Sequence, residues 1–270
     1  MLKGKTIMRL HFIKASPCRN TTVFITDPAA PAAYAKIARL AMSAEYLAAE
    51  QAGFLVAPQD PKSVLRLAMS GGEFCGNATL ALAALAVRQG LTDGTAFFVE
   101  CSGAAQPLAC TVRALPNGHW RARAEMPAGA GVRPLTLRVG ETVYTGGLVE
   151  LPGISHFVLP GPLAREQYAP LMEQLAAATV AEAYGVIPYT LVCEGTCRIV
   201  PYVYVPAAGS RVFEQACGSG SLSLGLWLHE QQGTAQLVVE QPGGELLVEA
   251  GAHSFIAAEV YFPCEGSLEI

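Results

Sequence analysis

The sequence predicts an α/β (α+β) protein in which one structural unit occurs twice. Two segments, 75–90 and 217–233, open with Cys-Gly, continue as an apolar stretch without proline and close on a glycine, which is typical of a buried helix that begins at the cysteine. Each helix is followed by a strand, a tight turn and a second strand. Because Cys75 and Cys217 lie about half the chain apart, we interpret the chain as a duplication.

The elements ahead of each cysteine repeat in one order. Alternating or wholly apolar β-branched runs predict strands, and apolar residues at helical spacing predict helices. The first half is expected to contain strands 8–15 and 21–27, helix 31–46, and strands 53–57 and 64–70. The second half is expected to contain strands 140–146 and 154–159, helix 165–184, and strands 189–195 and 197–205.

Pro and Gly cluster at residues 126–134, where the periodicity lapses. We therefore expect two domains, residues 1–128 with Cys75 and residues 129–270 with Cys217. The last strand of the chain is expected to pack against the first half.

Composition excludes several classes of partner. The net charge is −4 and Lys and Arg occur singly, which argues against nucleic acid or anionic lipid as a partner. The longest apolar run, residues 80–87, is far shorter than the roughly 20 residues that cross a bilayer. Charges interrupt the N-terminal stretch, so no secretory signal is expected. We expect a cytoplasmic protein with reduced thiols and a small-molecule substrate.

A cysteine at a helix start lies where unpaired backbone N–H groups and the helix dipole concentrate positive potential. This potential favours the thiolate and lowers the pKa, and the same N–H groups can bind a carboxylate. If a pseudo-twofold axis relates the halves, Cys75 and Cys217 would face one bound α-carbon, one thiolate removing its proton and the other thiol returning a proton to the opposite face. Backbone donors for the developing negative charge are expected at Gly76, Asn77, Gly218, Ser219 and Gly220.

No cofactor is expected. Lysine, which would anchor pyridoxal phosphate, does not occur after Lys62. Cys193 and Cys197 lack the further ligand pair that structural zinc needs, so we expect no metal. The five histidines are scattered, and for His11 and His156 a structural role is the simpler interpretation.

The motifs SGGEFCGNA and ACGSGS resemble the two cysteine motifs of the diaminopimelate epimerase family, and the resemblance covers essentially the whole chain. MSGGEFCGNAT, EQAGF, QACGSGS and VEQPGGELLV are similar to segments of the histidine racemases of opine-type (staphylopine-like) metallophore biosynthesis. The resemblance implies a diaminopimelate epimerase-like fold of two pseudo-symmetric domains, each with a curved sheet around a central helix. It also implies one catalytic cysteine from each domain, no cofactor and a homodimer.

The chain departs from the diaminopimelate epimerases at two motifs. RVFEQACGSG lacks their Glu-Arg-Gly element, and in LPGISHFV residue Ile154 stands where their Asn would be. A second amino-acid head group would therefore have little to bind it. Histidine, or another amino acid with a single head group, is the expected substrate.

The resemblance also implies substrate-binding residues. Gly76, Asn77, Gly218 and Ser219 would hold the α-carboxylate, and Asn20, Glu50, Gln51 and Glu214 would contact the rest of the substrate. Glu50 and Glu214 suit an α-ammonium or an imidazole donor. The alternative for each glutamate is a solvated surface charge, and Asn20 could simply cap a turn.

Two other classes of function are open. A thiol hydrolase would use one cysteine as nucleophile and would need a histidine beside it. An amino-acid-binding protein without activity would bind its ligand but exchange no proton. The presence of both thiols favours the racemase.

Overall fold

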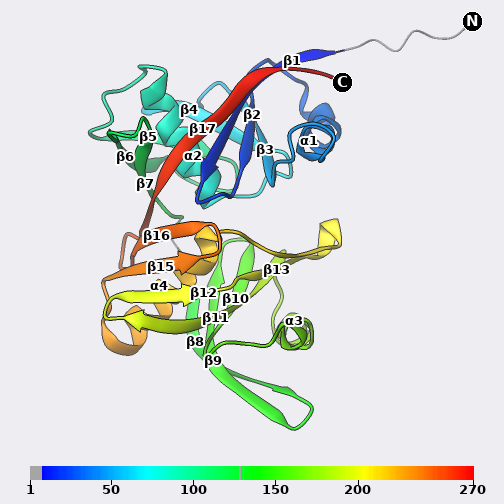
Figure 1. The fold of residues 1–270 in the computed structure, drawn as a ribbon, viewed down its shortest axis with the longest axis vertical. Helices are drawn as coiled ribbons and strands as arrows, with labels where there is room; N and C mark the ends of the chain where they lie inside the picture. Colours follow the sequence, from blue (N-terminus) through cyan, green and yellow to red (C-terminus); the bar gives the residue numbers. More distant parts are fainter. Residues whose placement is uncertain (1–7, 128, 130) are drawn as a thin grey trace, which may run out of the picture. The chain divides into compact units, whose positions relative to one another are not determined.

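The computed structural model describes residues 8–127, 129 and 131–270 of the chain (Figure 1). The fold is mixed α+β, as predicted. Contacts divide the chain into two compact units. Unit 1 contains the chain up to Ala122 together with Glu259–Ile270, and unit 2 is Arg123–Ala258. No helix of the described residues is long and apolar enough to span a membrane.

Unit 1 contains the first cysteine helix. Its strands are β1 (Arg9–Pro17), β2 (Thr22–Ile25), β3 (Gln51–Val56), β4 (Ser63–Met69), β5 (Phe97–Cys101), β6 (Leu108–Ala114), the start of β7 (Trp120–Glu125) and the end of β17 (Phe255–Glu269). Its helices are η1 (Pro31–Ala33), α1 (Tyr34–Met42) and α2 (Gly76–Arg88).

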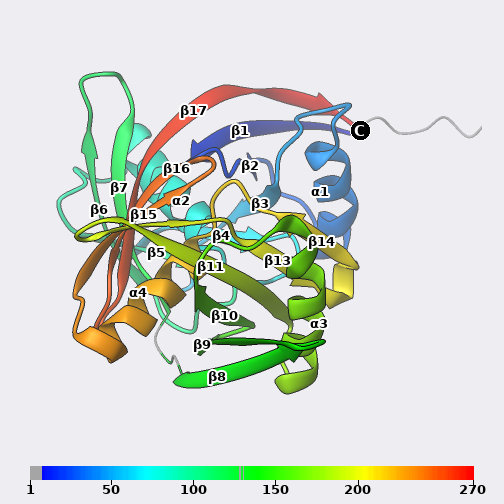
Figure 2. The same ribbon diagram turned by 60° about the horizontal axis from the view of Figure 1, so that its bottom comes forward.

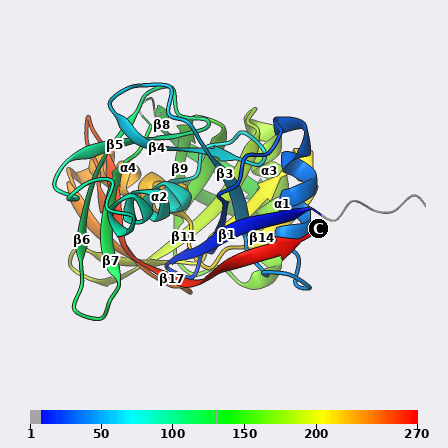
Figure 3. The same cartoon turned by 90° about the horizontal axis from the view of Figure 1, so that it is seen from above.

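The strands of unit 1 surround α2. β17 pairs with β1, β1 with β2, β3 with β4 and β5 with β6, all antiparallel, whereas β2 pairs with β3 and β4 with β5 in parallel. β7 pairs in turn with β17. Helix α2 is buried from Gly76 to Ala86 and contacts β1, β2, β4, β5 and β6 (Figure 3). An Ala- and Leu-rich helix without a polar face is expected to be buried on all sides.

Unit 2 contains the second cysteine helix. Its strands are the end of β7, β8 (Gly131–Val139), β9 (Thr142–Leu151), β10 (Ile154–Pro160), β11 (Ala183–Cys193), β12 (Thr196–Ile199), β13 (Tyr202–Val205), β14 (Ser210–Phe213), β15 (Gln236–Gln241), β16 (Gly244–Glu249) and the start of β17. Its helices are η2 (Arg165–Gln167), α3 (Tyr168–Ala178), η3 (Pro206–Ala208) and α4 (Gly218–Gln232).

The order of pairings in unit 1 occurs again in unit 2. β9 and β10 are antiparallel, β10 and β11 parallel, β11 and β12 antiparallel, β12 and β15 parallel, and β15 and β16 antiparallel. Helix α3 precedes β11 as α1 precedes β3, and α4 precedes β15 as α2 precedes β5. The two cysteine helices therefore occupy the same place in one repeated topology.

Two predicted elements of unit 2 were wrong in detail. The helix expected over 165–184 ends at Ala178, where Thr179 is extended (φ −149°, ψ 164°). The chain then enters β11 at Ala183 because parallel pairing with β10 requires an extended backbone there. The single strand expected over 197–205 is two strands separated by Val200 and Pro201, since proline cannot donate to a ladder.

The predicted junction, 126–134, contains a strand that was not expected. β8 begins at Gly131 and pairs with β9 along its whole length (Figure 2). Residues 128 and 130 lie outside the described residues.

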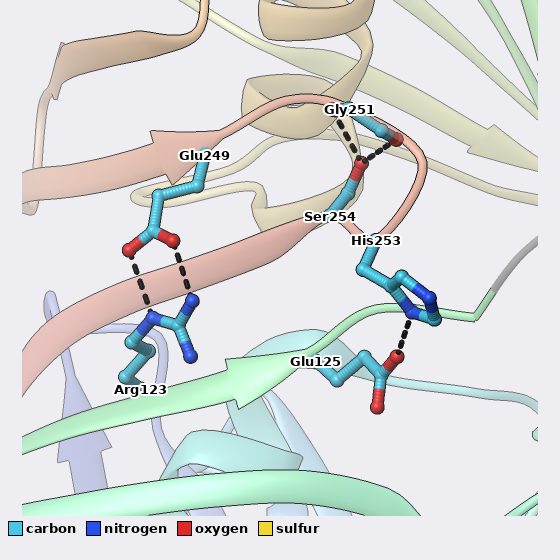
Figure 4. A network of polar contacts seen from close by, with 6 residues as sticks. All are labelled: Arg123, Glu125, Glu249, Gly251, His253 and Ser254. Carbon is cyan, nitrogen blue, oxygen red and sulfur yellow. Dashed lines mark hydrogen bonds and ion pairs between the residues drawn. The ribbon is translucent and has the colours of Figure 1, made fainter.

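Within unit 2, the end of β7 is joined to the β16–β17 segment by the Arg123–Glu249 ion pair and by a hydrogen bond between Glu125 and His253 (Figure 4). Arg123 Nε donates to Glu249 Oε1 at 2.8 Å, and its guanidinium also lies over the ring of Phe255. Glu125 Oε1 lies 3.0 Å from His253 Nδ1. The Arg123 guanidinium lowers the pKa of Glu249 through its hydrogen bonds and its charge.

Candidate active site

Cys75 caps helix α2 with its own sulfur. The residue is extended (φ −136°, ψ 114°), and its Sγ accepts a hydrogen bond from the backbone N of Ala78 at 3.3 Å. Thr79 Oγ1 donates to the carbonyl of Cys75 at 2.8 Å. The thiol therefore satisfies one of the N–H groups that a helix start leaves without an intrahelical acceptor.

Gln51 lies directly beside the Cys75 thiol. Cys75 Sγ donates to Gln51 Oε1 at 2.8 Å. The hydroxyl of Thr22, which lies opposite Gln51 in the β2–β3 register, also reaches Gln51 Oε1, at 3.4 Å. The Gln51 carboxamide therefore fixes the position of the Cys75 side chain at the start of α2.

The β1–β2 turn meets the loop that carries Glu50. The carbonyl oxygen of Thr21 accepts hydrogen bonds from the backbone N of both Glu50 and Gln51, at 3.1 Å each. Asn20 precedes Thr21 and is buried. Unit 1 therefore brings the chain at Asn20, Glu50, Gln51 and Cys75 together, and Gly76 and Asn77 follow Cys75 as buried residues of the first helical turn.

Cys217 caps helix α4 in the same way. Its backbone is extended (φ −119°, ψ 105°), and its Sγ accepts from Gly220 N at 3.3 Å. Ser221 Oγ donates to the Cys217 carbonyl at 2.7 Å, as Thr79 does in α2. Gln241 also stabilises this helix start, because its Oε1 accepts from Cys217 N at 2.7 Å and its Nε2 donates to Ser221 Oγ at 3.0 Å.

A buried histidine, judged structural from the sequence, lies next to this second helix start. Its Nε2 is 3.4 Å from Ser219 Oγ, which is itself 3.4 Å from Cys217 Sγ, and its Nδ1 is 3.1 Å from Ser223 Oγ. This residue, His156, is fully buried, and burial lowers its pKa to about 3, so the ring is neutral. Gly185 makes room for the ring, since a Cβ there would lie 2.3 Å from His156 Cδ2.

Burial raises the pKa of the Cys217 thiol well above its usual value, and the negative charge of Glu214 raises it further. Hydrogen bonds from Ser219 and Gly220 act in the opposite direction. The expectation that the helix start lowers the thiol pKa was therefore wrong for Cys217, because desolvation outweighs the N–H groups. Unit 2 brings Glu214, Cys217, Gly218 and Ser219 together with His156, which was interpreted from the sequence as structural.

Cys101 and Gln241 were not recognised as part of the site from the sequence. Cys101 ends β5 as Gln241 ends β15. Hydrogen bonds with the backbone of Cys75 and the side chain of Thr79 lower the pKa of the buried Cys101 thiol, although burial raises that pKa more. A polar or sulfur-bearing residue at the end of the strand after each cysteine helix was the available signal. Cys193 and Cys197, discounted as zinc ligands, are exposed and buried respectively.

Several solved structures share this arrangement of elements. The chain matches a probable proline racemase from Agrobacterium radiobacter with a TM-score of 0.73 and 11% identity, covering 97% of this chain and 92% of that one. It matches a phenazine biosynthesis protein of the PhzF family from Enterococcus faecalis with a TM-score of 0.67 and 16% identity, covering 97% and 100%. The fold is that of these proline racemase and PhzF-type proteins.

The fold and the sequence relatives together define an isomerase of the racemase class. A histidine racemase from Staphylococcus aureus is 29% identical over 247 residues, which is 88% of each chain. The family described as the histidine racemase CntK N-terminal domain matches residues 9–266, and the chain belongs to that family.

Proposed function

We propose that this protein interconverts L- and D-histidine, with Cys75 and Cys217 as its two acid/base groups. The observation that carries the proposal is the repeated helix start: each sulfur accepts the N–H three residues along the chain at 3.3 Å. Membership in the histidine racemase family supports the substrate. The relatives from Staphylococcus aureus and Fusobacterium nucleatum are both named histidine racemase.

The proposed reaction is a proton exchange at the α-carbon. One cysteine, as thiolate, removes the α-proton and becomes a thiol, and the other thiol donates its proton to the opposite face and becomes a thiolate. The net change is inversion, so no oxidant, reductant or cofactor is consumed. The mechanism requires both sulfurs to reach one bound α-carbon.

The remaining site residues are proposed to bind the substrate. Gly76, Asn77, Gly218 and Ser219 would donate hydrogen bonds to the α-carboxylate and stabilise the charge that develops on it. Asn20, Glu50, Gln51 and Glu214 would contact the ammonium group and the imidazole. Ile154, at the start of β10, offers no polar group to a distal amino-acid head, which disfavours diaminopimelate.

We extend the proposal to the finer class of fold and to the setting of the protein. The repeated topology supports a diaminopimelate epimerase-like fold with an N-terminal domain 1–128 and a C-terminal domain 129–270 whose last strand, β17, pairs with β1 of the first half. We also propose a cytoplasmic homodimer that supplies D-histidine to the biosynthesis of an opine-type metallophore. The exposed thiols of Cys193 and Cys264 are consistent with a reducing compartment.

A chiral assay over the twenty amino acids, with purified protein and no added cofactor, tests the substrate. We expect L-histidine and D-histidine to give the same mixture, and deuterium to enter Cα in heavy water. Turnover of diaminopimelate but not histidine would contradict the proposal. So would a stable acyl-enzyme with an acyl electrophile and no proton exchange, which would indicate a thiol hydrolase.

Cys75→Ser and Cys217→Ser test the two thiols. Serine keeps a helix-capping oxygen but is a far weaker acid than a thiol, so each variant should lose about 10²–10⁴-fold in kcat while remaining folded. Circular dichroism would check the fold. Full racemase activity in either variant would exclude the two-thiol mechanism.

A further inference from the structure

Lys14 connects β1 to a loop far along the chain. Its Nζ donates to the carbonyl oxygen of Leu47 at 2.6 Å and lies 3.5 Å from that of Ala48. Ala48 adopts φ +47°, a conformation that is costly for a residue with a Cβ. The ammonium therefore holds carbonyl groups at a strained point of the backbone, where a hydrogen bond to a charged donor is stronger than one to a neutral donor.

The same loop leads directly into the candidate site. Two residues after Ala48, the backbone N of Glu50 donates to the carbonyl of Thr21, and a second contact joins it to Thr21 Oγ1 at 3.2 Å. The next residue, Gln51, reaches the Cys75 thiol. Lys14 therefore holds this loop at Leu47 and Ala48, and Thr21 holds it at Glu50. Glu50 directly precedes Gln51, the residue that contacts the Cys75 thiol.

The charge of Lys14 also acts on Glu50. Protein atoms around the Glu50 carboxylate desolvate it and raise its pKa, and the nearby ammonium of Lys14 opposes this effect. The neighbouring elements carry further charged or titratable side chains, namely His11 on β1, Arg19 after β1, Lys36 and Arg39 on α1, Glu45 after α1, and Glu73 and Cys75 before α2. Among the described groups, Lys14 is the one whose charge shifts the pKa of Glu50.

We propose that Lys14 is a positioning residue for substrate binding, whose ammonium group fixes the 47–50 loop so that Glu50 can bind the cationic group of the amino acid. The proposal rests on the proposed function, in which Glu50 contacts the substrate. Lys14 touches backbone carbonyls and acts through Glu50, so its effect is expected on binding rather than on proton transfer.

Three variants separate the two contributions of Lys14. Lys14→Met removes both the hydrogen bonds and the charge, Lys14→Gln keeps a donor without the charge, and Lys14→Arg keeps both. We expect Lys14→Met to raise the KM for L-histidine about tenfold with kcat within about twofold, a loss equivalent to one charge-assisted hydrogen bond. Lys14→Arg should restore most of the binding. Lys36→Met, the same change at an exposed position of α1, is the matched control and should leave KM unchanged.

The pH profile identifies the role of the charge. Without the ammonium the pKa of Glu50 rises further, so the acid limb of kcat/KM should move to higher pH in Lys14→Met and Lys14→Gln and stay in place in Lys14→Arg. In the Glu50→Gln background, Lys14→Gln should have no further effect on KM, because the carboxylate it acts on is absent.

Wild-type turnover of histidine is measured first, and its absence would refute the proposed function rather than the role of Lys14. With an active wild type, an unchanged KM and acid limb in folded Lys14→Met would overturn the proposal. A parallel loss of kcat and thermal stability without a shift of the acid limb would also overturn it, by assigning Lys14 a purely structural role. Full additivity with Glu50→Gln would do the same.

Discussion

The helix starts at Cys75 and Cys217 share their backbone geometry but differ in their surroundings. Both sulfurs cap their helices at the same distance, and a hydroxyl, of Thr79 or Ser221, fixes each cysteine carbonyl. Cys75 is half-buried beside the Gln51 carboxamide, whereas Cys217 is buried beside Ser219 and an anionic Glu214. The duplicated fold has kept the position of each sulfur while its neighbours, which set proton affinity, have diverged.

The largest expected difference between the two thiols is in their reactivity. In the substrate-free protein, iodoacetamide should modify Cys75 about a hundredfold faster than Cys217, because burial and Glu214 disfavour the Cys217 thiolate and limit access to it. Peptide mass spectrometry would measure each site separately. The exposed Cys193 and Cys264 serve as internal references, and equal rates at Cys75 and Cys217 would remove the contrast.

The residue that ends the strand after each cysteine helix, Gln241 in unit 2 and Cys101 in unit 1, should contribute differently to stability. Gln241→Ala leaves the buried Cys217 N–H without its carboxamide acceptor and should lower the free energy of unfolding by about 1–3 kcal/mol. The matching change in unit 1, Cys101→Ala, removes only a weak sulfur acceptor and a small side chain, and should cost about 1 kcal/mol. Denaturant titrations of both variants test this, and a costlier Cys101→Ala would reverse the ranking.

Glu214→Gln should bring the reactivity of the Cys217 thiol closer to that of the Cys75 thiol. Removing the carboxylate removes a repulsion that raises the pKa of Cys217, so the thiolate fraction of Cys217 at a given pH should increase. Alkylation of Cys217 as a function of pH measures the shift directly. If the pKa of Cys217 stays in place or rises, desolvation alone accounts for it.

The smallest expected effect on stability concerns the β1–β2 turn of unit 1 and the β9–β10 turn of unit 2. Arg19, in the β1–β2 turn, has φ +60°, whereas the β9–β10 turn places Gly153 at φ +81°. Because Asn tolerates positive φ better than Arg, Arg19→Asn should stabilise the protein by about 0.5 kcal/mol. This corresponds to a rise in Tm of about 1–2 °C. A fall in Tm would mean that the Arg19 side chain makes compensating contacts.

Local sequence was sufficient to predict both cysteine helices, which are confirmed. Their starts and ends are coded by adjacent residues: Cys-Gly at the beginning, and a left-handed Gly233 (φ +73°) just after α4. The end of α3 was predicted wrongly because residues 176–183, rich in alanine, favour a helix locally, whereas pairing with β10 makes β11 extended.

Parts of the site depend on residues distant in the sequence, and these could not be predicted. His156 approaches Ser219 and Ser223 from a strand more than sixty residues away, so nothing beside it in the sequence distinguishes it from a structural histidine. Likewise, the helix start at Cys217 predicts a lowered thiol pKa, but the burial that raises it comes from the surrounding sheet.

Because each cysteine sulfur caps its helix, chemical modification of the sulfur would also weaken the start of that helix. A bulky adduct on the Cys217 sulfur would displace it from the Gly220 N–H, so the first turn of α4 would lose the hydrogen bond that now caps it. A molecule modified at Cys217 would therefore open more easily at this helix and be degraded faster by proteases.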